Sequence, residues 1–241
     1  MSRTLTGRRT AAFTEAQLSV AWQSASLLLG YPDDELLGRL ELLRQASTQL
    51  PDRAGEPLRA CVTRLQETPL TELESDYVDT FDTRRRHNLF LTYFAHGDTR
   101  KRGMALLRFK QTYLASGFEL TDTELPDHLC VVLEYAATID RELGRQLLLD
   151  HRAGLELLRI ALGESGSRWA GAVEAITATL PPLQGDEWEA VRRLAAAGPP
   201  EEEVGLTPYA TPAFDPGPAA PDGPTLLPMP SFPTPPVKGA R

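Results

Sequence analysis

The stretch TEAQLSVAWQSASLLLG, residues 14–30, sets a pattern that most of the chain repeats. Thr14 with Gln17 three positions later is a capping-box signal, which marks the start of a helix. Apolar side chains then recur at helical spacing on one face, and Gly30 supplies a stop signal. This face comprises Leu18, Ala21, Trp22, Ala25, Leu28 and Leu29. The stretch therefore predicts an amphipathic helix packed on a core.

The same helical period continues to residue 198, and no alternating strand pattern extends beyond a few residues. Further helices are predicted to begin at Pro32, Pro57, Thr71, Asp98 or Thr99, and Pro126, and three more are centred on Leu155, Ile176 and Val191. The helix that follows Asp98 is expected to bury Met104, Leu106, Phe109 and Tyr113. We expect an all-α fold, a single helical bundle of about eight to nine helices.

The C-terminal part of the chain has a different composition. Thirteen of the twenty prolines follow Gly198, a density that is incompatible with helix or a central strand. We expect a flexible N-terminus at 1–12, an all-helical domain at 13–198 and a disordered proline-rich tail at 199–241. Short proline steps such as Pro230 to Pro233 leave a docking role for the tail open, beside the simpler interpretation of a solvated tail.

The net charge of −8 argues against a general attraction to nucleic acid or to anionic membranes. The two cysteines, Cys61 and Cys130, lie far apart in apolar helical patterns, so no disulfide framework or CxxC site is expected. The Arg8-Arg9 pair is not followed by an apolar export segment, and no run approaches the roughly 18 apolar residues of a membrane span. We expect no membrane insertion and a cytoplasmic location.

One segment breaks the helical period. Between Asp82 and Asp98 lies an aromatic loop that is longer than the roughly two to eight residues usual between bundle helices. Basic side chains bracket it, at 84–86 and 100–102. A solvated basic face is one interpretation, and an anionic partner is another. Aromatics interleaved with arginine keep a helical nucleic-acid-binding protein using the basic 84–102 region as an alternative, and a scaffold using the proline tail is a further one.

The motifs of common enzymes are missing. No glycine-rich loop has phosphate-binding spacing, and GESGS at 163–167 lacks the final glycine of a nucleophile elbow, so it is interpreted as a helix-to-helix loop. The four histidines form no zinc-binding pair. Glu124, Asp127 and His128 could hold an acid/base group, but the interpretation favoured from the residues alone is two carboxylates at a helix start and a surface histidine.

Four motifs nevertheless coincide in residues 77–137: YxxxFD, LTYFxxGDTRxRGxALxxF, YxxxGF and ELPDxLxxxLEY. With this spacing the chain resembles the nitrate reductase molybdenum cofactor assembly chaperones, the delta subunit or NarJ family, within the all-helical TorD/DmsD group of redox-enzyme maturation proteins. Thr80 departs from the pattern, because the wider group often has leucine at that position.

The resemblance implies a chaperone of nitrate respiration and nitrate assimilation, and not an enzyme. Such proteins bind the N-terminal segment of the apo catalytic (alpha) subunit of respiratory nitrate reductase and assist insertion of the molybdenum cofactor before membrane docking. No stably bound cofactor is implied. The resemblance leaves open a transient contact with the molybdenum bis-guanine-dinucleotide cofactor and with molybdenum cofactor biosynthesis proteins, and it implies no nucleic-acid partner.

Carried onto this sequence, the resemblance implies a client-peptide-binding set and no catalytic or metal-ligating residue. The set comprises Tyr77, Phe81, Leu91, Tyr93, Phe94, Gly97, Asp98, Arg100, Arg102, Glu124, Pro126, Asp127 and His128. Its aromatic members would bury apolar anchors of the client, and its carboxylates would meet basic client residues through charge-assisted hydrogen bonds. Its arginines would meet acidic groups of the client or phosphates of the cofactor.

Overall fold

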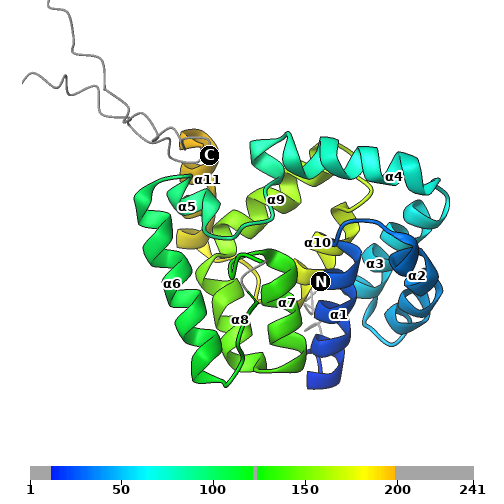
Figure 1. Ribbon diagram of the computed structural model, residues 1–241, viewed down its shortest axis with the longest axis horizontal. Coiled ribbons are helices and arrows are strands. Elements are labelled where there is room, and N and C mark those ends of the chain that lie inside the picture. Colours follow the sequence, from blue (N-terminus) through cyan, green and yellow to red (C-terminus); the bar gives the residue numbers. More distant parts are fainter. Residues whose placement is uncertain (1–11, 122–123, 199–241) are drawn as a thin grey trace, which may run out of the picture. The chain divides into compact units, whose positions relative to one another are not determined.

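The computed structural model describes residues 12–121 and 124–198. The predicted proline-rich tail and nearly all of the predicted flexible N-terminus lie outside these residues. Over the described residues the structure is all-α, as predicted, with eleven α-helices, a π-helical turn η1, a 3-10 turn η2 and no strand (Figure 1). A single isolated bridge between Phe90 and His128 is the one β-type pairing found there.

The elements follow one another with short connections. Their bounds are α1 (Glu15–Leu28), α2 (Asp34–Ser47), α3 (Asp52–Gln66), α4 (Leu70–Tyr77), η1 (Val78–Asp82), η2 (Arg85–His87), α5 (Tyr93–His96), α6 (Arg100–Ala115), α7 (Leu129–Thr138), α8 (Arg141–Asp150), α9 (Arg152–Glu164), α10 (Ala170–Thr179) and α11 (Gly185–Ala197).

The described helices outnumber the predicted eight to nine for two reasons. The predicted loop contains the short helix α5, and the long helix expected around Leu155 is divided at His151 into α8 and α9. His151 has φ −109° and ψ 19°, which leaves the helical region, although neither proline nor glycine stands at the break. Packing of the two halves, and not a local signal, therefore decides the division.

Several helix starts were predicted from capping signals, with mixed outcome. The capping box of α1 is confirmed: the Thr14 hydroxyl accepts a hydrogen bond from the Gln17 N–H at 3.2 Å, and the Gln17 side chain accepts one from the Thr14 N–H at 3.0 Å. At α6 the cap residue is Thr99, but its hydroxyl donates backward to the His96 carbonyl at 2.7 Å. The N-terminus of α6 therefore has no side-chain cap.

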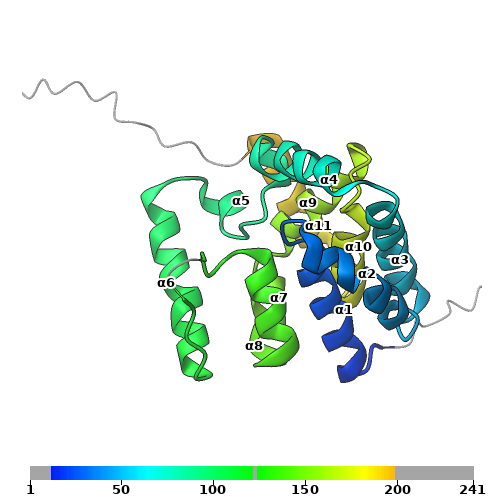
Figure 2. The same cartoon turned by 45° about the vertical axis from the view of Figure 1, so that its right-hand side comes forward.

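The core lies where the first three helices meet the last ones. α1 packs on α7 and α10, α3 packs on α10 and α2, and α9 packs on α10 and α11 (Figures 1 and 2). Trp22 and Trp169 are fully buried at the centre. The Trp22 indole N–H donates to the Thr179 hydroxyl at 2.9 Å, which satisfies the polar end of a side chain whose burial stabilises the fold by about 1.5–3 kcal/mol or more.

Candidate client-binding site

The site begins where two segments distant in sequence cross. The Leu91 N–H donates to the Asp127 carbonyl at 3.0 Å, and the Leu129 N–H donates to the Leu89 carbonyl at 2.8 Å. Between these bonds Phe90 faces His128 in an antiparallel bridge. A buried backbone needs such partners. The aromatic loop that lacks a helical period is therefore fixed by pairing with the segment before α7.

A buried carboxylate lies at this crossing. Asp127 is fully buried and accepts hydrogen bonds from the Thr92 hydroxyl at 2.5 Å and the Thr92 N–H at 3.2 Å, both through Oδ2. Arg102 Nη2 lies 3.7 Å from the same oxygen. Asp127 Oδ1 and Arg102 Nη2 have no hydrogen-bond partner among the described residues. Because a buried charge is costly unless it is paired, this cluster ties the start of α6 to the crossing.

Arg102 is the member of the basic trio that the protein itself uses. Its side chain is only 15% exposed. Nη1 donates to Asp98 Oδ1 at 3.1 Å, Nε donates to the Thr92 hydroxyl at 3.3 Å, and the guanidinium carbon lies 5.0 Å from the centre of the Phe90 ring. Arg100 is exposed. The arginines predicted to share a role are thus separated by the fold, one structural and one facing solvent.

His128 is the N-cap of α7, with Nδ1 accepting from the Cys130 N–H at 3.3 Å. Its ring meets Phe90 edge to face at 5.1 Å. Burial lowers the pKa of His128, and the carboxylates of Glu124 and Asp127 oppose that shift in part. The expectation of a surface histidine after two helix-terminal carboxylates was wrong, because Asp127 points inward to Thr92 and only Glu124 is exposed. The helix also begins at Leu129, with Pro126 buried in the preceding turn.

The predicted apolar contacts are part of the core. Leu91, Tyr93 and Phe94 are no more than 6% exposed. A Cβ built on Gly154 of α9 would lie 2.9 Å from a Phe94 ring carbon, which shows how closely α5 packs on α9. A client peptide can reach these side chains only after some part of this packing opens.

Tyr77 and Phe81 form a separate aromatic group. Their ring centres are 4.7 Å apart, and each stacks on Trp169, at 5.5 Å and 5.4 Å respectively. The Tyr77 hydroxyl donates to the Leu29 carbonyl at 2.9 Å, and burial raises the pKa of that hydroxyl. These two residues anchor α4 and η1 to the core. The contacts that the structure shows for them are with α1 and the start of α10, and none is with the crossing.

The remaining predicted residue is Gly97, which joins α5 to α6. It has φ 55°, in the left-handed region that glycine adopts without strain. Thr92 and Tyr113 were missed in the predicted set. Tyr113 of α6 donates its hydroxyl to the Pro126 carbonyl at 2.6 Å, which is a second tie between α6 and the crossing. A lone threonine inside an aromatic run was the only sequence signal for Thr92.

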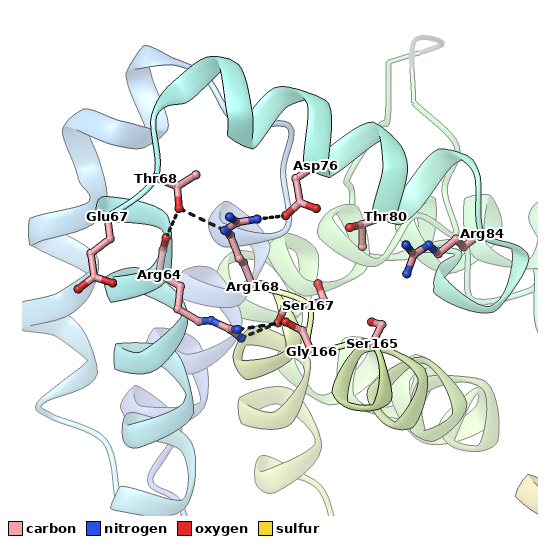
Figure 3. A pocket seen from close by; sticks show the side chains of 10 residues that line it. All are labelled: Arg64, Glu67, Thr68, Asp76, Thr80, Arg84, Ser165, Gly166, Ser167 and Arg168. Carbon is pink, nitrogen blue, oxygen red and sulfur yellow. Dashed lines mark hydrogen bonds and ion pairs between the residues drawn. The ribbon is translucent and has the colours of Figure 1, made fainter.

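A polar cavity of about 540 Å³ lies between α3, the α4–η1 segment and the α9–α10 loop (Figure 3). Arg64 donates to the carbonyls of Ser167 and Gly166 at 3.0 and 3.1 Å, and Arg168 is paired with Asp76 and Glu72. Most charged groups that line it are thus engaged with each other. The stretch GESGS is confirmed as a helix-to-helix loop, and its carbonyls tie that loop to α3.

Two searches of the described residues bear on other kinds of site. No group of three or more His, Cys, Asp or Glu side chains within 12–121 and 124–198 is arranged to hold a metal ion. None of the helices in the same part of the chain has the length and apolar character needed to cross a membrane.

Comparison with known proteins gives related results at several levels. The family model for the nitrate reductase delta subunit matches residues 45–175. The nitrate reductase-like protein NarX of Mycobacterium tuberculosis is 41% identical over 160 residues, which are 66% of this chain and 24% of that protein. This chain therefore spans about a quarter of the length of that relative.

A relative of similar size is the probable nitrate reductase molybdenum cofactor assembly chaperone NarJ of Bacillus subtilis, 32% identical over 163 residues, which are 67% of this chain and 88% of that one. The assembly chaperone NarJ of Escherichia coli K12 is 32% identical over 148 residues, 60% of this chain and 63% of that one. The relatives of this size are named as chaperones and not as enzymes, as predicted for this chain.

Among solved structures, the crystal structure of a proposed redox enzyme maturation protein from Archaeoglobus fulgidus matches with a TM-score of 0.50 and 20% identity, covering 71% of this chain and 96% of that one. At this identity the match supports the fold alone. Together with the match to the family model and the similarity to the Bacillus protein, the motifs of residues 77–137 lead to one conclusion: the chain belongs to the nitrate reductase delta subunit family.

Proposed function

We propose that this protein is an assembly chaperone that binds the N-terminal segment of the apo catalytic subunit of a molybdenum-dependent nitrate reductase in the cytoplasm. Its relatives are named for molybdenum cofactor assembly of nitrate reductase. The observation that carries the proposal is the crossing, where the two motif segments that resemble the family most closely, 89–102 and 124–129, are brought together by direct hydrogen bonds.

The way α6 is held supports a site that opens. Phe109 and Tyr113 are the only buried side chains among its sixteen residues. The other ties between α6 and the crossing are the contacts of Arg102 with Thr92 and Asp127. Release of these contacts would uncover Leu91, Tyr93 and Phe94 for the apolar anchors of a client. Segments with few buried contacts open at low free-energy cost, and such opening also permits later release of the client.

The polar residues around the crossing supply the complementary charge. Glu124 is exposed beside it and is available to a basic client residue. We propose no resident cofactor, and a transient contact with the molybdenum bis-guanine-dinucleotide cofactor or its biosynthesis proteins remains part of the proposal through the client. The reductase N-terminal segment is the partner on which the test below depends.

The test is a titration of the full chain with a fluorescent peptide of the catalytic subunit's N-terminus. We expect saturable binding and a loss of about five- to tenfold in affinity for Glu124→Ala, the effect of one charge-assisted hydrogen bond. Glu134→Ala is the matched control, because Glu134 is an exposed glutamate on the outer side of α7. Absence of binding at tens of micromolar, or an equal loss for both variants, would contradict the proposal.

A further inference from the structure

The outward face of α6 carries an exposed apolar stripe. Met104, Leu107 and Leu114 are 63%, 45% and 60% exposed, and at about 100° per residue they fall within one arc of roughly 80°. Met104 was expected in the core, but it lies on the side of the helix opposite Phe109. α6 lies at the left edge of the domain in both ribbon views (Figures 1 and 2). No described element covers this stripe.

The same helix carries an unbalanced charge. It contains five cations and no acidic residue, in a chain whose net charge is −8. Arg102 is engaged with Asp98 and Asp127. The other four have no ion-pair partner among the described residues. They are Arg100, Lys101, Arg108 and Lys110. Cations in the first turn oppose the helix dipole, so they do not serve the stability of α6.

The positions of these cations relative to the stripe define what would bind. Arg108 and Lys101 fall on one side of the stripe and Lys110 on the other, so an apolar strip has a basic margin on both sides. From Met104 to Leu114 the helix rises about 15 Å, which is close to three turns. A partner helix with anchors at i, i+3 or i+4, and i+7 fits a strip of this length. Acidic side chains beside those anchors would reach the cations on both margins.

We infer that the outward face of α6 is a docking surface for an acidic amphipathic helix of a protein partner. A lipid surface fits less well, because Gln111 lies on the centre line of the stripe and its amide would enter the apolar layer unpaired. In a helix–helix contact the same amide can bond to a side chain of the partner. A nucleic acid fits less well because the exposed side chains between the cations are aliphatic, whereas single strands bind through aromatic stacking.

This surface is independent of the proposed client site. The client is proposed to enter beneath α6 at the crossing, where Glu124 attracts basic residues. The outward face lies on the opposite side of the helix and selects acidic ones. The two sites can therefore be tested with peptides of opposite charge on the same full-length protein.

The test uses fluorescence anisotropy of the full chain with three synthetic helical peptides. The first has leucines at i, i+3, i+7 and i+10 flanked by glutamates, the second has the same leucines flanked by lysines, and the third has the glutamates with alanines in place of the leucines. We expect the first to bind in a saturable manner, and the other two at least tenfold more weakly.

Two variants of α6 locate the site. Leu107→Ser with Leu114→Ser removes the stripe, and Arg108→Glu with Lys110→Glu reverses the margin; each is expected to weaken binding of the first peptide at least tenfold. All four side chains are exposed, so circular dichroism should remain unchanged. Leu42→Ser is the matched control, an apolar side chain 65% exposed on α2, and it should bind as the wild type does.

Several outcomes would overturn the inference. One is equal binding of the three peptides, and another is insensitivity to both α6 variants. A third is sedimentation showing that the α6 variants instead abolish self-association, which would assign the face to a second copy of the chain. Binding of the wild type to phosphatidylserine–phosphatidylcholine vesicles or to a single-stranded oligonucleotide, lost in the variants, would assign it to lipid or nucleic acid. Loss of binding to the reductase peptide alone would leave this surface intact and count only against the proposed function.

Discussion

Asp127 is the residue on which the site depends most directly. It stands in a stretch with the appearance of a helix start, yet its carboxylate faces Thr92 and Arg102 from positions far along the chain. Arg102 contacts two carboxylates, one fully buried and one 77% exposed. The same cation therefore allows a buried and an exposed ion pair to be compared within one cluster.

Asp127→Ala is expected to lower the free energy of unfolding by about 3 kcal/mol or more, because it leaves Arg102 and the Thr92 hydroxyl without their buried partner. Asp98→Ala removes the exposed partner of the same arginine and should cost less than about 1 kcal/mol. Urea denaturation of both variants measures the difference. Similar losses for the two would show that the buried pair does not hold α6.

At the scale of elements, the contact between α5 and α9 fixes the position of the aromatic loop. Phe94 occupies space that a side chain at position 154 would need. Gly163 lies on the same helix α9, and a Cβ there would meet no atom within 4 Å. The two glycines thus separate the effect of close packing from the effect of glycine on helix stability.

Gly154→Ala is expected to destabilise the protein by about 1–3 kcal/mol, because the new methyl group overpacks the contact with Phe94. Gly163→Ala should leave stability unchanged or raise it by up to about 1 kcal/mol, since alanine favours helix. Thermal unfolding followed by circular dichroism provides the measurement. If Gly154→Ala were also neutral, α5 would be less firmly packed than the structure shows.

For the whole molecule, three histidines in different parts of the fold respond to pH in the same direction. Burial is the main cause that lowers the pKa of His87, His128 and His151. A lowered pKa in the folded state means that the unfolded chain binds protons more readily as the pH falls below about 6.5. Their contribution to stability is complete above that pH and is lost as the pH falls toward the folded pKa values.

We expect the urea midpoint to be lower at pH 5 than at pH 7.5. His128→Asn should reduce that difference, because it removes one of the three groups while asparagine can still cap α7. Denaturation of both proteins at the two pH values gives the comparison. A pH dependence that His128→Asn leaves unchanged would show that His128 is not protonated differently in the folded and unfolded chains.

The sequence alone determined the helical class, the capping box of α1, the loop nature of 163–167 and the family motifs, because helical period and capping depend on residues a few positions apart. Tertiary structure decided the division of α8 from α9 at His151, the burial of Asp127 against Thr92 and Arg102, and the exposure of Met104. These depend on contacts between distant segments, and no local pattern specifies which side chain a buried charge will meet. The basic trio shows the difference at one place: its composition was evident from the sequence, but only the fold assigned Arg102 to the interior and left Arg100 and Lys101 facing outward.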